Sequence, residues 1–160
     1  MRLLIAAVGK LKQGPERELF ELYLGRAEAI GRKLGLTPLN VIEVAEARAA
    51  TAQARVEAEA QTLLAKLPAS HKLICLDRDG DKLSSEDFAR TLTRFRDGGA
   101  QGLAFFIGGP DGLGLSASYK ADKVVSLGPM TLPHGLARVL LAEQIYRAGT
   151  ILAGHPYHRG

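Results

Sequence analysis

The sequence has little cysteine and no long apolar run. Its single cysteine, Cys75, has no second cysteine to pair with, which excludes an intramolecular disulfide and predicts a buried thiol in a reducing compartment. No segment reaches the roughly 18 consecutive apolar residues of a membrane span. The four histidines lack the clustering of zinc ligands. We therefore expect neither a membrane nor a metal partner.

The N-terminal residues 1–14 combine one early positive charge with a short apolar run, but no small-residue cleavage site follows. This pattern favours a first strand over a signal peptide, and with the lone cysteine it predicts a cytoplasmic protein. The net charge of +4 fits an anionic partner such as RNA. Many ordinary enzymes share such an excess, so charge alone decides little.

The chain contains enough apolar residues to form the hydrophobic core of one domain. Its 160 residues are 46% hydrophobic and 24% charged, which is typical of a globular protein that buries its own core. No internal repeat or low-complexity linker divides it, so residues 1–160 are predicted to form a single domain.

Short apolar runs alternate with longer segments of helical periodicity. This alternation predicts an α/β fold with a mostly parallel sheet flanked by helices. Helices are expected at residues 15–34, 51–67, 85–97 and 133–152, and strands at residues 2–8, 38–44, 72–77, 102–108 and 123–128. The acidic stretch at residues 77–81 (DRDGD) is interpreted as a turn.

The stretch FFIGGPDGLG, at residues 105–114, runs from an apolar strand into a loop rich in glycine. Its glycines match neither the dinucleotide fingerprint nor the phosphate-binding P-loop. In a parallel sheet this loop would share one edge with the strand ends at residues 76–77 and 127–132. Glycines at such an edge let backbone groups approach a flat ligand closely.

Three segments carry a resemblance to a known family. Residues 107–113 (IGGPDGL), 126–148 (SLGPMTLPHGLARVLLAEQIYRA) and 155–160 (HPYHRG) are similar to the ribosomal RNA large subunit methyltransferase H family of SPOUT-class pseudouridine methyltransferases. The start, LLIAAVGKLK, fits as well, so the resemblance spans the chain. Asp111 replaces a familiar glutamate, and Gly128-Pro129 replaces a more serine-like pair.

The resemblance implies a SPOUT fold with a C-terminal trefoil knot, which no pattern of residues would predict. It implies a homodimer that uses S-adenosylmethionine to methylate N3 of a pseudouridine in 23S rRNA of the assembled ribosome. The positions that match the family's cofactor pocket are Leu76, Gly108, Leu127, Gly128, Pro129, Met130, Thr131 and Leu132.

The C-terminal tail supplies the candidate catalytic residues. N3 of a uracil-type ring is an imide whose proton must leave, so a base or a cation is required there. The resemblance implies that the tail closes over the active site of the neighbouring protomer. We expect His158 or Arg159 to assist the loss of the proton or to stabilise the anion, and Tyr157 to stack on the base or hydrogen-bond to it.

Other charged residues have two interpretations. Glu143 and Arg147 form either a surface helix pair or part of the site, while Arg138 and Arg147 are candidates for contact with phosphates or the partner subunit. Candidates for the rRNA backbone are Lys10, Lys12, Arg17, Arg26, Arg32 and Lys33.

Two other functions compete with this hypothesis. One is a catalytically silent ribosome-binding factor with the same fold, which the intact loops and tail disfavour. The other is a SPOUT enzyme that acts on tRNA, which the lack of a tRNA-gripping extension disfavours.

Overall fold

The computed structural model describes residues 1–159, and its centre is a five-stranded sheet in the order β2-β1-β4-β3-β5. All four pairs of neighbouring strands are parallel. This arrangement confirms the predicted α/β fold, whereas the trefoil knot stays a prediction. The strands are β1 (Arg2–Val8), β2 (Leu39–Val44), β3 (His71–Lys82), β4 (Gly102–Ile107) and β5 (Lys123–Ser126).

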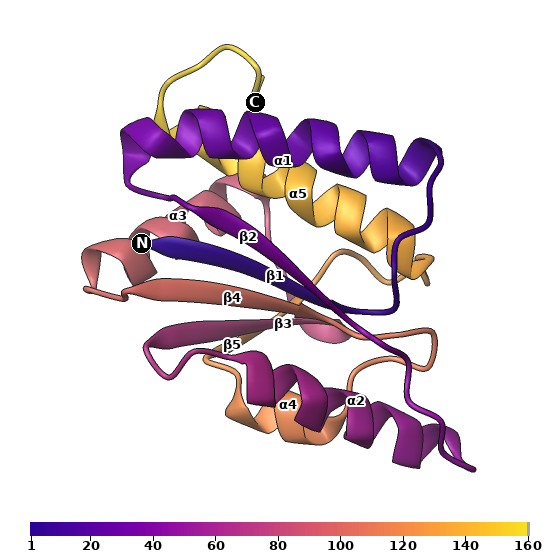
Figure 1. Cartoon of the computed structure of the whole chain (residues 1–160). Helices are drawn as coiled ribbons and strands as arrows, with labels where there is room; N and C mark the ends of the chain where they lie inside the picture. The colour runs from indigo at the N-terminus through magenta and orange to yellow at the C-terminus, as the bar shows by residue number, and fades with distance from the viewer. Residues whose placement is uncertain (160) are drawn as a thin grey trace.

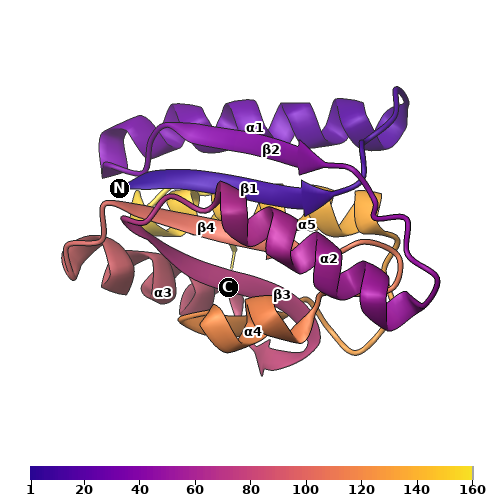
Figure 2. The ribbon, with the colours of Figure 1, turned by 60° about the horizontal axis from the view of Figure 1, so that its bottom comes forward.

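Helices cover both faces of the sheet (Figures 1 and 2). Helices α1, α3 and α5 lie on one face, where α5 packs against both of the others, and α2 and α4 lie together on the opposite face. Their bounds are α1 (Pro15–Leu34), α2 (Ala52–Lys66), α3 (Ser85–Asp97), α4 (Leu115–Lys120) and α5 (His134–Leu152). The short helix α4 was not predicted; the other four were, to within about two residues.

Local signals explain where the helices begin and end. Thr51 accepts a hydrogen bond from the backbone N–H of Ala54, and Ser84 does the same for Asp87, so each caps a helix N-terminus. Helix α1 has proline in its first turn and ends at Gly35, which adopts the left-handed conformation. These caps confirm the predicted boundaries.

The core lies in two layers, one on each face of the sheet. Consecutive residues of β4 serve different layers: Phe105 packs under α3 and α5, and Phe106 packs under α2 and α4. Burying each ring contributes about 2–3 kcal/mol. Cys75 is also buried, and burial, aided by the charge of Asp77, raises the pKa of its thiol to about 12. The predicted buried thiol is confirmed.

The predicted turn at residues 77–81 is wrong in part. Leu76 and Asp81 of β3 both lie opposite Val125 of β5, so the residues between them form a bulge inside a longer strand. Gly80 makes the return possible, because a β-carbon there would come within 2.7 Å of the Val125 nitrogen. Strand β3 continues after the bulge because Asp81 and Lys82 can pair with Val125 and Ser126 of β5.

None of the described helices is long and apolar enough to cross a membrane. Within residues 1–159, no group of three or more His, Cys, Asp or Glu side chains is placed to hold a metal ion.

Candidate functional site

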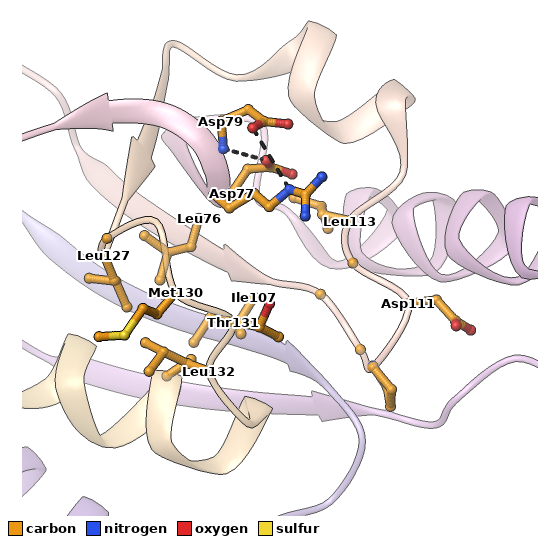
Figure 3. A pocket seen from close by; sticks show the side chains of 17 residues that line it. Leu76, Asp77, Asp79, Ile107, Asp111, Leu113, Leu127, Met130, Thr131 and Leu132 are labelled. Carbon is orange, nitrogen blue, oxygen red and sulfur yellow. Dashed lines mark hydrogen bonds and ion pairs between the residues drawn. The ribbon is translucent and has the colours of Figure 1, made fainter.

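A cavity of about 490 Å³ opens at the carboxyl end of the sheet (Figure 3). It lies between the bulge of β3, the glycine-rich loop after β4 and the loop after β5, with Ala137 of α5 contributing to the wall. Parallel strands end at a common edge, which is why three loops distant in sequence meet here.

Seven of the eight residues predicted to bind the cofactor line this cavity. Pro129, the eighth, does not, although both of its neighbours do. The structure therefore brings the predicted set together, while their binding of a ligand stays a prediction. The seven are Leu76, Gly108, Leu127, Gly128, Met130, Thr131 and Leu132.

The glycine-rich loop is a tight turn. The N–H of Gly112 donates to the carbonyl oxygen of Gly109 at 3.0 Å, with Pro110 at the second position of the turn, where its fixed φ is favourable. Gly112 has a φ of 99°, which other residues rarely adopt. The turn thus brings the backbone of Gly108, Gly109 and Gly112 to the cavity wall, beside Pro110 and Asp111.

Helix α2 holds this turn from behind. Arg55 donates from Nε to Asp111 at 3.0 Å and from Nη1 to the carbonyl of Ala49 at 3.1 Å. Glu59 is buried; it accepts from the N–H of Ala47 at 2.8 Å, and its other oxygen lies beside Gly109. The conformation of the loop is therefore supported by a helix that ends more than 40 residues earlier in the chain.

The loop after β5 closes the other side of the cavity. Gly128 has a φ of 130°, and its N–H donates to Oγ of Ser126 at 3.1 Å. Met130 follows with 79% of its surface exposed. Glycine at position 128, a departure from the family pattern, suits this left-handed backbone.

The cavity is lined by leucine side chains, by backbone groups of the glycines and by the charged side chains of Asp77, Arg78, Asp79 and Asp111. Figure 3 shows Asp77 and Asp79 on one side and Met130, Thr131 and Leu132 on the other. The Asp79 N–H donates to Oδ1 of Asp77 at 2.9 Å, which orders the bulge. Asp79 and Arg78 were missed as lining residues because the sequence predicted a simple turn there. The leucine side chains could pack on a flat apolar group, and Asp77 offers a carboxylate to a positive charge, whereas Asp79 lies beside Arg78.

The tail is placed elsewhere, against α5. Glu143 is 12% exposed, and its Oε1 accepts from Nη2 of Arg147 at 2.6 Å and from the Tyr157 hydroxyl at 3.0 Å. The Tyr157 ring packs on Tyr146, with 4.7 Å between the ring centroids. Burial, with hydrogen bonds to Tyr23 and Glu143, raises the pKa of Tyr157, so its phenol keeps its proton. The Glu143–Arg147 pair is therefore more than a surface ion pair.

His158 connects the tail to α3. Its Nε2 lies 2.7 Å from Oε1 of Glu86, and its Nδ1 lies 3.4 Å from Nη1 of Arg147. Since Arg147 can only donate, the neutral tautomer with its proton on Nε2 satisfies both contacts. Backbone hydrogen bonds at the start of α3 and the bond from His158 lower the pKa of Glu86.

The candidate catalytic residues do not reach the cavity of their own chain. No residue from 155–159 lines it; Tyr157 and His158 are held against α3 and α5, and Arg159 is exposed. Gly160, the last residue of the predicted tail motif, lies outside the described residues. Within one chain, the tail residues therefore lie apart from the cavity residues, and the predicted role of the tail at the neighbouring protomer's site stays a prediction.

The interpretation of Arg138 as a residue that contacts phosphates or a partner is wrong. Its side chain is 0% exposed and pairs with Glu43 at 2.7 Å. Burial lowers the pKa of this guanidinium, and Glu43 opposes the shift. Helical spacing placed Arg138 on a face of α5 but could not predict that this face is covered.

Comparisons with known proteins agree on one family. A family model described as "Predicted SPOUT methyltransferase" matches residues 1–158. Ribosomal RNA large subunit methyltransferase H of Xanthobacter autotrophicus is 54% identical over 159 residues, covering 99% of this chain and 99% of the relative. The protein of that name from Methylobacterium sp. is 50% identical over 160 residues, covering 100% and 99%.

A solved structure shares the fold. The probable methyltransferase from Bordetella pertussis Tohama I superposes with a TM-score of 0.50 at 19% identity, over 92% of this chain and 95% of that chain. At this identity the likeness concerns the fold alone.

Proposed function

The chain belongs to the ribosomal RNA large subunit methyltransferase H family of SPOUT methyltransferases, and we propose that it methylates N3 of a pseudouridine in 23S rRNA of the assembled ribosome with S-adenosylmethionine. The observation that carries this proposal is the meeting of three strand-end loops in one cavity. A single domain over residues 1–160 belongs to the same proposal, supported by two core layers on one sheet.

The cavity fits the proposed cofactor. Its volume of about 490 Å³ lies in the range of small-molecule sites. Leu76, Leu127 and Leu132 offer an apolar surface to a purine ring, and the Gly108–Gly109 backbone offers hydrogen bonds to its edge. Asp77 offers a carboxylate to the positive charge of the methionyl part. When bound, the sulfonium supplies an activated methyl group whose leaving group is neutral.

The chain's own residues act on the acceptor. The imide proton of N3 must leave before or during attack, and the resulting negative charge must be stabilised. His158 and Arg159 remain the two candidates for this step. A guanidinium is a poor base, so Arg159 suits stabilisation of the anion better. Tyr157, whose phenol keeps its proton, can donate a hydrogen bond to the base or stack on it.

The proposal includes a homodimer in which each tail completes the partner's site. The separation of Tyr157 and His158 from their own cavity supports this arrangement. So does the exposed apolar surface beside the cavity, where Met130, Leu136 and Leu140 are 79%, 40% and 38% exposed. Apolar side chains of this size next to a site are typical of interfaces.

The contacts with rRNA are expected from the remaining basic residues. Arg17 pairs with Glu21, and Arg26 lies over the Tyr23 ring, so both are engaged within α1. The exposed side chains of Lys10, Lys12, Arg32 and Lys33 are better placed for phosphates. An rRNA substrate inside the ribosome places the enzyme in the cytoplasm.

The test is transfer of a labelled methyl group from S-adenosylmethionine to ribosomes that lack the modification. Assembled ribosomes, free large subunits and tRNA are offered side by side, and the label is located by mass spectrometry. We expect label on N3 of a pseudouridine of the large-subunit rRNA, strongest in assembled ribosomes. Cofactor binding without transfer would favour the silent ribosome-binding factor, and label on tRNA would favour the tRNA enzyme.

A further inference from the structure

The fully buried side chain of Arg138 joins three elements at the carboxyl end of the sheet. Its Nη2 donates to the carbonyl oxygens of Val8 and Gly9 at 2.6 and 2.7 Å, and its Nη1 donates to Oε1 of Glu43 at 2.7 Å. These acceptors lie at the end of β1 and in β2. One guanidinium therefore attaches the second turn of α5 to two strands.

Glu43 extends the connection to the next loop. The same Oε1 that contacts Arg138 accepts from the backbone N–H of Leu11 at 2.8 Å. Glu43 keeps 28% of its side chain exposed, whereas Arg138 keeps none. Three bonds hold Nη1 and Nη2, while the buried Nε has no partner among the described residues. A buried charge costs stability unless it is paired, so the guanidinium depends on these three bonds.

The attachment lies directly next to the cavity. Ala137 lines the cavity, and Leu132, which also lines it, lies two residues before α5 begins. Pro133 caps the helix without a side-chain hydrogen bond. The bond between Gly128 and Ser126 orders the first part of this loop. The position of the second part of the loop, residues 130–133, depends on where helix α5 begins.

We propose that Arg138 is a positioning residue for the cofactor site: through Glu43 and the end of β1 it sets the place of α5 and hence of residues 130–133. This inference rests on the proposed function. Lysine cannot replace arginine here, because a single ammonium lacks the planar fork that reaches two carbonyls and a carboxylate together.

The test compares Arg138→Lys, Arg138→Met and Glu43→Gln with the unaltered chain. Thermal melting measures stability, calorimetry with S-adenosylmethionine measures affinity, and amide hydrogen exchange of the ligand-free chain measures the order of residues 127–137. For Arg138→Lys and Arg138→Met we expect faster exchange in that segment and affinity weaker by about tenfold. Glu43→Gln keeps one acceptor oxygen but removes the charge that compensates the buried guanidinium, so it should change exchange and affinity in the same direction by a smaller factor.

A matched control lies at the opposite edge of the sheet. Asp122 accepts from Nζ of Lys72 at 2.9 Å and from the N–H of Leu73 at 2.8 Å, so Asp122→Asn lowers stability without touching the cavity. It should leave affinity and the exchange of residues 127–137 unchanged.

The outcomes separate this inference from the proposed function. If the Arg138 variants fold, melt earlier and yet keep wild-type affinity and exchange, Arg138 is only structural and the inference is overturned. If Arg138→Met does not fold, the affinity and the hydrogen exchange of Arg138→Lys alone test the inference by the same criterion. If the unaltered chain does not bind S-adenosylmethionine, the proposed function fails first, whatever the exchange data show for residues 127–137.

Discussion

The carbonyl oxygen of Gly112 occupies the space that a β-carbon on Gly108 would need. The turn after β4 therefore closes only around a glycine at position 108. We predict that Gly108→Ala opens this turn, lowers stability by about 1–3 kcal/mol and weakens S-adenosylmethionine binding at least about tenfold. Calorimetry and thermal melting measure both effects.

The control for this change is Gly25→Ala. Gly25 is exposed inside α1, and nothing lies within 4 Å of a β-carbon there. Alanine should raise stability by about 0.5–1 kcal/mol and leave cofactor affinity unchanged. Wild-type affinity in Gly108→Ala would contradict the role given to this turn.

The Arg55–Asp111 pair should restrain the same turn from outside. Asp111→Ala removes the acceptor, and because the pair is exposed the loss is small, about 0.5–1 kcal/mol in binding free energy, or two- to fivefold in affinity. The difference should shrink in high salt. Glu21→Ala, which breaks the exposed pair with Arg17 far from the cavity, should have no effect on affinity. An equal loss in both variants would refute the restraint.

Removal of residues 157–160 should separate binding from catalysis. None of the described tail residues lines its own cavity, so the shortened chain should keep cofactor affinity within about twofold while methyl transfer to ribosomes is lost. Tyr157→Phe keeps the ring on Tyr146 and removes only the hydrogen bonds of the hydroxyl to Glu143 and Tyr23, so it should lose less activity. A shortened chain with full activity would exclude the tail from the mechanism.

The stability of the protein should fall as the pH drops below about 6.5, with His71 contributing. Burial, and next the charge of Arg2, lower the pKa of His71 in the folded chain. The unfolded state then binds more protons between the folded and unfolded pKa values, so the free energy of unfolding rises with pH across that window. The ring is only half-buried, which keeps the effect below about 1 kcal/mol.

Urea unfolding at pH 7.5 and 5.5 measures this effect. His71→Gln should flatten the pH dependence, whereas His155→Gln, a change in the exposed tail, should not. An unchanged slope in His71→Gln would remove His71 as a source of the pH dependence.

Much of the fold follows from local signals in the sequence. Four helices and five strands begin near their predicted residues because caps, proline and the spacing of apolar side chains act within a few positions. The cavity was predictable for a related reason. Once the strands are parallel, the loops that carry Leu76, Gly108 and Leu132 must share one edge of the sheet.

Two local predictions missed because distant residues decide them. Helix α4 has six residues and no side-chain cap, and it forms where Gly114 approaches the Val56 carbonyl of α2. The bulge at residues 77–80 returns to the sheet only because β5 lies beside it. The residues in and around these two segments do not indicate that β5 and α2 will pack against them.

The sequence by itself determined the family, the order of every element except α4 and seven of the residues around the cavity, because each rests on a motif or on a short periodic pattern. The tertiary structure alone decided which charges are buried and where the tail lies. Arg138 pairs with acceptors 95 and 130 positions earlier, and His158 contacts Glu86, 72 positions earlier. No local pattern encodes such separations, since they arise when the strands align and α5 packs across them.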